Sequence, residues 1–142
     1  MKLSDEINVL ETNIDDCSGE VLGYTLERLF KAGARDAFYS PIFMKKNRPA
    51  YKLTVLCDDE HIEVMEDIIF EETTTIGIRR RKEIRTILKR ELSEVDTKYG
   101  KLGVKIAKLN GKDKVYPEYD CAKKLAEKNS VSLKEIYNQI NK

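Results

Sequence analysis

The stretch ETNIDDCSGE, residues 11 to 20, places the carboxylates Glu11, Asp15, Asp16 and Glu20 where a strand gives way to a helix. Acidic residues at a helix start stabilise the helix dipole, so Asp15 and Asp16 can be ordinary capping residues. They can equally hold a hard cation such as Mg²⁺, which takes one or two carboxylates and leaves its other positions to water and phosphate. This stretch alone leaves both interpretations open.

A second polar cluster is the segment MKKNRP, which carries Lys45, Lys46 and Arg48 in a predicted turn between two strands. A solvated basic turn is a common surface feature. Asn47 and Pro49 stiffen this turn, however, and three cations on a stiff loop suit a polyphosphate. We also expect Pro49 to exclude a regular strand ladder at this point.

The third cluster, ETTTIGIRRRKEIR, combines threonine hydroxyls, backbone N–H groups beside a glycine, and forked arginine donors. It does not match the phosphate-binding loop pattern GxxxxGK[ST]. In a strand, Arg79 and Arg81 share one face and Arg80 takes the other, so one face can hold phosphate while the other pairs with acidic neighbours. The candidate ligand residues of this cluster are Thr73, Thr74, Thr75, Gly77, Arg79 and Arg80.

The composition of the chain excludes several classes of protein. Its 142 residues suffice for one compact domain, or for one domain with a small appendage. The 26 basic and 25 acidic residues nearly cancel, so net charge indicates neither a nucleic-acid nor a membrane partner. The N-terminus lacks the apolar core of a signal peptide. Three widely spaced cysteines favour a reducing, cytoplasmic setting.

Hydrophobic periodicity predicts an α+β fold whose first part has the order βαββαβ, that of the ferredoxin-like unit. Pro41 marks the second strand as an edge strand or a bulge. In this order the turns at 15–18 and 45–49 need not lie at the same end of the sheet, and contact across subunits is one way to join them. The predicted elements are strand 7–14, a helix begun by Asp16 or Ser18 and ended at Gly33, strand 37–44, a strand from Tyr51 to Cys57, a helix capped by Asp58 or Asp59, and a strand from Ile76.

The remaining sequence predicts a smaller appendage. Residues 76–97 form one long charged strand or two strands in line, followed by a hairpin around Gly100 and a type I′ turn at Asn110 and Gly111. Helices follow Pro117 and Ser132, the latter in a capping box. We therefore expect a ferredoxin-like subdomain of residues 1–75 with the first part of the strand from 76, and a hairpin and helical subdomain of residues 86–142. The second part looks too poor in apolar residues to fold alone.

Other chemistries have less support in the sequence. The single histidine, His61, is expected at the surface early in a helix, and no tetrahedral zinc pattern is present. No spacing supports a Cys–His nucleophile pair. An RNA-binding domain of this fold needs aromatic residues on its central strands, whereas Tyr39, Phe43 and Tyr51 are better explained by packing. RNA binding stays an alternative on these residues alone.

Three motifs in order, ETNIDD-x-SGE, AGA-x-DAFYSPIFMKKNRPAYKLTVLC and EETTTIGIRR, resemble the C-terminal domain of LarC-type nickel insertion proteins. The resemblance extends through PEYDCAKKLAE at residues 117–127. These proteins complete the nickel-pincer nucleotide cofactor of lactate racemase. The family's proteins are much longer than this chain, so the resemblance implies a C-terminal domain or a separately encoded half. In the family motif position 17 is commonly methionine, which argues against Cys17 as an essential nickel ligand.

The resemblance implies a CTP-dependent nickel insertase of the lyase class. Its substrate is a pyridinium mononucleotide bearing two thiocarboxylates, between whose sulfurs Ni²⁺ is placed. CTP is used with Mg²⁺ or Mn²⁺, and the domain assembles into trimer-based homo-oligomers. Nucleic acid and membrane are not expected partners. A non-catalytic oligomerisation and nucleotide-sensing module is the alternative, and full activity is expected to need the missing part of the protein.

The clusters fit this implied activity through a division of roles. Asp15 and Asp16 would hold the metal on the triphosphate, while cationic side chains neutralise the phosphates. The threonines and the backbone around Gly77 would complete the site. The soft sulfurs of the substrate can draw nickel away without a dense cage of His and Cys ligands in the protein. The predicted cations are Lys45, Lys46, Arg48, Arg79 and Arg80, with Asn47 in the same loop.

Overall fold

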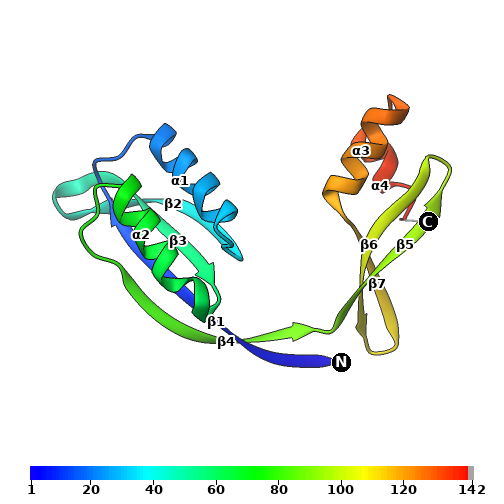
Figure 1. Ribbon diagram of the computed structural model, residues 1–142, viewed down its shortest axis with the longest axis horizontal. Helices are drawn as coiled ribbons and strands as arrows, with labels where there is room; N and C mark the ends of the chain where they lie inside the picture. Colours follow the sequence, from blue (N-terminus) through cyan, green and yellow to red (C-terminus); the bar gives the residue numbers. More distant parts are fainter. Residues whose placement is uncertain (141–142) are drawn as a thin grey trace. The chain divides into compact units, whose positions relative to one another are not determined.

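The structure is a computed structural model that describes residues 1–140 (Figure 1). The chain divides into two compact units. One unit comprises Asp5–Arg85, and the other combines Met1–Ser4 with the chain from Thr86 onward. The first four residues belong to the second unit because the Met1 amino group donates to the carbonyl of Lys108 and the Lys89 amide donates to the carbonyl of Met1.

The first unit is a four-stranded sheet with the strand order β2-β3-β1-β4, covered by two helices. The β3 strand pairs antiparallel with both β1 and β2. This order confirms the ferredoxin-like topology predicted from the βαββαβ sequence. Its elements are β1 (Lys2–Ile14), α1 (Gly19–Lys31), β2 (Asp36–Met44), β3 (Arg48–Cys57), α2 (Ile62–Glu72) and β4 (Arg79–Leu88).

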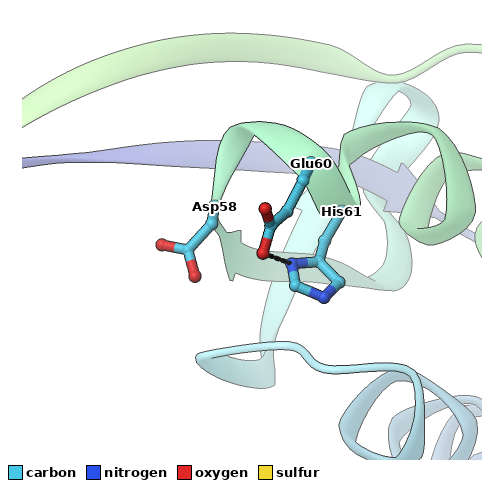
Figure 2. A group of neighbouring side chains, drawn as sticks. All are labelled: Asp58, Glu60 and His61. Atoms are coloured by element: carbon cyan, nitrogen blue, oxygen red, sulfur yellow. Dashed lines mark ion pairs between the residues drawn. The ribbon is translucent and has the colours of Figure 1, made fainter.

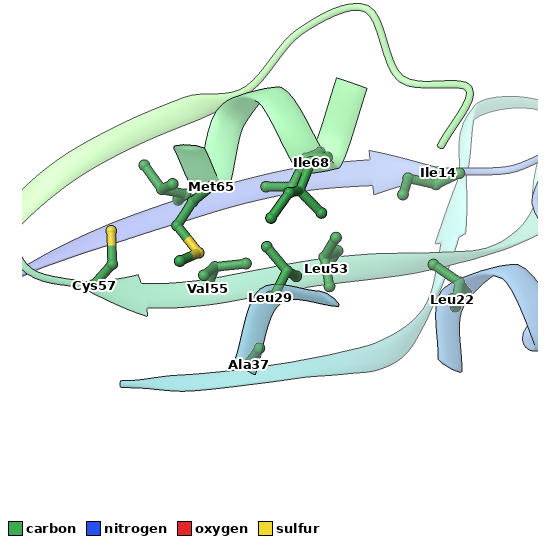
Figure 3. Packing of buried hydrophobic residues seen from close by; sticks show 11 residues of the cluster. Ile14, Leu22, Leu29, Ala37, Leu53, Val55, Cys57, Met65 and Ile68 are labelled. Atoms are coloured by element: carbon green, nitrogen blue, oxygen red, sulfur yellow. The ribbon is translucent and has the colours of Figure 1, made fainter. Parts of the chain in front are cut away.

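The core of this unit lies between the helices and one face of the sheet (Figure 3). Leu53 and Val55 on β3 are fully buried, as are Leu22 and Leu29 on α1. Met65 on α2 is also fully buried, so both helices contribute side chains to the same core. Burial of each such side chain contributes about 1.5–3 kcal/mol. This packing fixes the ends of the strands, where the connecting turns lie.

The ends of α1 agree with the sequence prediction. Ser18 is the N-cap residue, and its hydroxyl accepts a hydrogen bond from the amide of Val21 at 3.3 Å. Gly33 follows the C-cap residue Ala32 with φ of 103°, a left-handed conformation that glycine adopts without steric cost. Of the two predicted N-caps, Ser18 therefore begins the helix and Asp16 does not.

The predicted cap of α2 is wrong. A short 3₁₀ turn, η2 (Asp59–His61), precedes the helix, and neither Asp58 nor Asp59 makes a side-chain capping bond. The Asp59 carboxylate instead accepts hydrogen bonds from Asn8 and Lys82. Because the Asp59 carboxylate bonds to these two distant residues, it does not cap α2 as the sequence pattern predicted.

The prediction that Pro49 excludes a ladder is also wrong. The β3 strand begins at Arg48, and Pro49 stands opposite Phe43 of β2. The pairing of β3 with β1 begins only at Tyr51, so Pro49 has a neighbouring strand on one side alone. Because no described strand lies on its other side, the N–H that proline lacks is not needed for a hydrogen bond to β1. Pro41 lies in the edge strand β2, as predicted. The last strand of the unit begins at Arg79 rather than at Ile76.

The second unit contains a three-stranded antiparallel sheet of order β5-β6-β7 and two helices. Asn110 and Gly111 both have positive φ, as the predicted type I′ turn requires, and the turn leads into a strand, β7, that the sequence analysis did not identify. The Ser132 hydroxyl caps the last helix by accepting from the amide of Glu135 at 3.1 Å. The elements are β5 (Arg90–Thr97), β6 (Gly100–Leu109), β7 (Lys112–Pro117), α3 (Tyr119–Asn129) and α4 (Leu133–Tyr137).

This unit has a core of its own, contrary to the expectation that it holds too few apolar residues. Leu102 and Val104 of β6 are fully buried against Ala122 of α3 and Ile136 of α4. Partly buried hydrophobic side chains, among them Val95, Ile106 and Leu125, pack against this cluster and enlarge the core. No described helix in the chain is long and apolar enough to cross a membrane.

Candidate functional site

Three connections of the first unit lie at one end of its sheet (Figure 1). They are the β1–α1 turn at residues 15–18, the β2–β3 turn η1 (Lys45–Asn47), and the α2–β4 segment at residues 73–78. The register explains this, because Ile14 at the end of β1 stands opposite Tyr51, near the start of β3. The antiparallel fold therefore places the acidic turn and the basic turn together within one chain, and no contact across subunits is needed to join them.

The two aspartates of the first turn each have a partner from another connection. The Asp15 carboxylate lies 3.3 Å from the Arg48 guanidinium, which begins β3. The Asp16 carboxylate accepts a hydrogen bond from the Thr74 hydroxyl of the α2–β4 segment. All three predicted clusters are thus joined by side-chain contacts through these two aspartates.

The other two carboxylates of the opening stretch do not join them. Glu11 accepts from Arg79 at 3.1 Å and from Arg81 at 3.2 Å. These hydrogen bonds, that of Arg81 first, lower the pKa of Glu11 below its ordinary value, and burial opposes the shift. Glu20 is exposed in the first turn of α1. The four-carboxylate cluster of the sequence therefore reduces to Asp15 and Asp16.

The three threonines of the α2–β4 segment, Thr73, Thr74 and Thr75, have different hydrogen-bond partners. The Thr73 hydroxyl donates to the carbonyl of Ile69 at 2.7 Å and closes the end of α2. The Thr75 hydroxyl lies 2.6 Å from that of Thr12, and both are within hydrogen-bond distance of the Gly77 carbonyl. Thr74 alone reaches the acidic turn. Thr12, buried on β1, holds the segment in place. It was not among the residues predicted from the sequence, although it interrupts an apolar strand face.

The basic turn is tight and its lysines are exposed. Lys46 and Asn47 adopt left-handed conformations, with φ of 61° and 59°. Such conformations cost of order 1 kcal/mol for residues other than glycine and are frequent at functional sites. Lys45 and Lys46 make no ion pair with any carboxylate of residues 1–140. Their charges are therefore available to a ligand.

Arg79 and Arg80 leave β4 on opposite faces, as predicted, but each has an acidic or polar partner. Arg79 donates to Glu11 and, at 3.0 Å, to the side-chain oxygen of Asn13. Arg80 donates to Glu66 of α2 at 3.1 Å. Both faces of β4 therefore have acidic neighbours. A phosphate at Arg79 or Arg80 would share the guanidinium with a carboxylate.

Cys17 lies beside the acidic turn and packs against the core. Burial, together with the charge of Asp16, raises the pKa of the Cys17 thiol. Cys17 is therefore a protonated thiol at neutral pH rather than a ready thiolate ligand.

A separate polar cluster lies at the other end of β3, where Asp58, Glu60 and His61 surround the turn η2 (Figure 2). The sequence predicts His61 at the surface. The structure buries its Nδ1 atom and places it 3.8 Å from a Glu60 carboxylate oxygen. The run of acidic residues before the only histidine was the available signal for this cluster.

The sequence matches the nickel insertion protein family over residues 2–137. It is 52% identical over 134 residues to the pyridinium-3,5-bisthiocarboxylic acid mononucleotide nickel insertion protein of Alkaliphilus metalliredigens, covering 94% of this chain and 32% of the relative. It is 48% identical over 141 residues to the protein of the same name from Acetivibrio thermocellus, covering 99% of this chain and 35% of the relative. The chain spans about a third of the length of these curated relatives.

Solved structures agree with this match. The fold resembles apo LarC2, the C-terminal domain of a cyclometallase involved in the synthesis of the NPN cofactor of lactate racemase, with a TM-score of 0.89 at 40% identity over 97% of this chain and 96% of that one. It also resembles protein MK0293 from Methanopyrus kandleri, with a TM-score of 0.68 at 27% identity over 94% of this chain and 85% of the other. These matches confirm the resemblance drawn from the motifs: the chain belongs to the nickel insertion protein family and is similar to its LarC-type C-terminal domain.

Proposed function

We propose that this chain is the part of a nickel insertion protein that binds CTP together with a divalent cation. The nickel itself is the substrate, which the whole protein inserts into pyridinium-3,5-bisthiocarboxylic acid mononucleotide. The observation that carries this proposal is the meeting of acidic, basic and hydroxyl-bearing connections at one end of a single ferredoxin-like unit. The curated relatives carry the name of this substrate, which supports the insertion step.

Asp15 and Asp16 are the proposed ligands of a Mg²⁺ or Mn²⁺ ion carried by the triphosphate. Their oxygens are hard donors, which suit these ions better than the soft or imidazole donors of a nickel or zinc cage. Asp15 is already paired with Arg48, and Asp16 with Thr74. With such a complex bound, Asp15 and Asp16 would hold the metal, and Arg48 would exchange its carboxylate partner for phosphate.

The exposed lysines of η1 would contribute charge that no carboxylate of the described chain neutralises. Lys45 and Lys46, on a turn held by two left-handed residues, can approach phosphate without first breaking an ion pair. Arg79 would join from the neighbouring strand, since its partner Asn13 lies two residues before Asp15. Arg80 is paired with Glu66 on α2 and is the weaker candidate of the two.

The role of the protein in this arrangement is positioning and charge neutralisation, the usual sources of catalysis in phosphoryl and nucleotidyl transfer. Because the chain spans about a third of its curated relatives, we propose that complete insertion needs the rest of the protein. A nucleotide-binding and oligomerising module without turnover is the second candidate, and the same length difference favours it. Incubating the isolated chain with CTP, Mn²⁺ and no other protein, and assaying CTP consumption, distinguishes the two.

Calorimetric titration with CTP tests the binding proposal. We expect binding in the presence of Mn²⁺ or Mg²⁺, a sharp loss of affinity when the cation is chelated, and weaker binding of ATP. Equal affinity for ATP and CTP, or affinity that ignores the cation, would remove the proposed site.

A further inference from the structure

The cluster at the β3–α2 turn has no role in the proposed CTP site. Asp58, Glu60 and His61 each present one possible ligand atom, and these atoms lie within 4.8 Å of one another (Figure 2). The cluster and the CTP site are separated by the length of β3, which runs from Arg48 to Cys57. Any ligand of this cluster is therefore a separate ligand.

The imidazole of His61 is held so that one nitrogen is left unsatisfied. Its Nδ1 atom is buried and has no hydrogen-bond partner among residues 1–140. The Glu60 oxygen at 3.8 Å is beyond hydrogen-bond distance. The Nε2 edge of the ring packs against Gly33, where an added Cβ would lie 2.8 Å from the nitrogen. A buried polar atom without a partner is costly, and a cation bound at Nδ1 would remove that cost.

The turn itself is fixed by bonds that do not involve the possible ligand atoms. The buried Asn8 side chain donates to the Asp59 carboxylate at 2.7 Å, and Lys82 donates to it at 2.8 Å. The His61 amide donates to the Asp58 carbonyl at 3.0 Å. The Asp59 carboxylate therefore stabilises the turn and is not one of the possible ligands. The possible ligand atoms belong to Asp58, Glu60 and His61, which lie around the turn.

The surroundings carry an excess of negative charge. Four carboxylates, those of Glu6, Asp58, Asp59 and Glu60, line an open hollow of about 370 Å³ together with Lys82. The Asp58 carboxylate also lies 2.9 Å from Arg35. Two cations thus face four carboxylates, and a divalent ion would balance the remainder.

We infer that Asp58, Glu60 and His61 bind a divalent first-row transition-metal ion of the Ni²⁺ type. One imidazole nitrogen beside two carboxylates suits Ni²⁺, Zn²⁺ or Co²⁺, whereas Mg²⁺ takes oxygen ligands alone. The Glu60 side chain is 80% exposed, so it can rotate toward the ion without disturbing the core. Three protein ligands leave positions open to water, which suits an ion that is exchanged rather than kept. This inference does not depend on CTP binding.

The single histidine of the chain makes the test direct, because its ring gives the only imidazole signals in an NMR spectrum. Wild-type protein is titrated with NiCl₂ in a buffer free of chelators and CTP. We expect a single Ni²⁺ to bind and the imidazole resonances to broaden first. Unchanged imidazole resonances at saturating Ni²⁺ would overturn the inference, since binding would then lie elsewhere, for example at a cysteine.

Variants give a second, independent measurement. His61→Gln and Asp58→Asn should each weaken Ni²⁺ binding by about tenfold or more, a loss typical of disturbed metal sites. Glu63→Gln is the matched control, because it removes an exposed carboxylate close to the cluster but outside it. Equal Ni²⁺ affinity in wild type and in a folded His61→Gln variant would overturn the inference. CTP binding with Mn²⁺ should be unchanged in these variants, which separates this inference from the proposed function.

Discussion

The guanidinium of Arg48, the first residue of β3, lies 3.3 Å from the carboxylate of Asp15, the residue that follows β1. This contact joins the basic turn to the acidic turn within one ferredoxin-like unit. Both side chains are partly accessible, so the pair contributes little to folding, between about 0 and 1 kcal/mol. Its significance is positional, because it sets a cation and a carboxylate side by side where the proposed metal–triphosphate complex would need both.

The basic turn should affect ligand binding far more than stability. Changing Lys46 or Arg48 to Ala should weaken CTP binding by about tenfold, because each change removes a charge that would face the phosphates in the proposed site. The melting temperature should stay nearly constant, since exposed charges contribute little to folding. Calorimetry and thermal unfolding measure the two effects, with Lys31→Ala on α1 as a control. If either variant unfolded while its remaining folded molecules bound CTP with unchanged affinity, the turn would have a structural role and no role in CTP binding.

Thr12 should be a positioning residue for the α2–β4 segment. Its buried hydroxyl bonds to Thr75 and to the Gly77 carbonyl. Thr12→Val keeps the shape and removes these bonds, so the free energy of unfolding should fall by about 1–2 kcal/mol. Thr12→Ser, which retains the hydroxyl, should restore CTP affinity more than it restores stability. Urea unfolding and CTP titration of both variants check this, and a Val variant that binds CTP normally would contradict it.

Acid should destabilise the first unit partly through Glu11. Its hydrogen bonds to Arg81 and Arg79 lower the pKa of Glu11 in the folded state below the ordinary value of 4.5. The unfolded chain therefore binds more protons in this range, and stability rises with pH. The contribution is fully present above pH 4.5 and is lost as pH falls through the lowered folded pKa. Glu11→Gln should show a shallower loss of melting temperature below pH 4.5 than wild type, with Glu20→Gln as the control. Parallel curves for Glu11→Gln and wild type would rule out this role.

The chain should self-associate through an edge of its larger sheet. The β4 strand is an edge strand, and Ile84 on it is 76% exposed. Such edges pair with other strands unless they are covered, and closed cyclic assemblies are the usual result. Light scattering at tens of micromolar should give a mass above that of the monomer, with a trimer-based assembly as the family resemblance implies. Ile84→Lys should lower that mass, and a monomeric wild type would refute the prediction.

The sequence predicted those features of the fold that depend on local chemistry. Hydrophobic periodicity indicated the βαββαβ order, and residue type alone identified Gly33 as the end of α1 and Ser18 as one of two candidates for its start. The β7 strand was missed because charged residues dominate KDKVYP and leave little apolar alternation. The prediction that Pro49 excludes a strand ladder was wrong because Pro49 lies beyond the part of β3 that pairs with β1. That limit is set by the register between the two strands, which the local sequence does not reveal.

The three polar clusters could be identified from the sequence, but their meeting at one end of the sheet could not. The residue types of the three clusters indicated a metal and a polyphosphate, yet their meeting depends on the antiparallel topology of the whole unit. The bond between Thr12 and Thr75 and the packing of the His61 ring against Gly33 both join residues that are far apart in sequence. Spacing in the sequence grouped Glu11 with Asp15. In the structure, the Glu11 side chain instead forms ion pairs with two arginines of β4, Arg79 and Arg81.

Mn²⁺-dependent CTP binding by Asp15→Asn and Asp16→Asn tests the proposed metal site most directly. Asn keeps the size and hydrogen bonding of Asp, and the N-cap of α1 is Ser18, so both variants should fold with normal melting temperatures. If the aspartates hold the metal on CTP, the cation-dependent part of the affinity should fall by about tenfold or more, roughly 1.4 kcal/mol. Asp36→Asn, at the start of β2, is the control and should bind like wild type. Wild-type affinity and wild-type cation dependence in both aspartate variants would contradict the proposed metal site and leave Asp15 and Asp16 with a structural role alone.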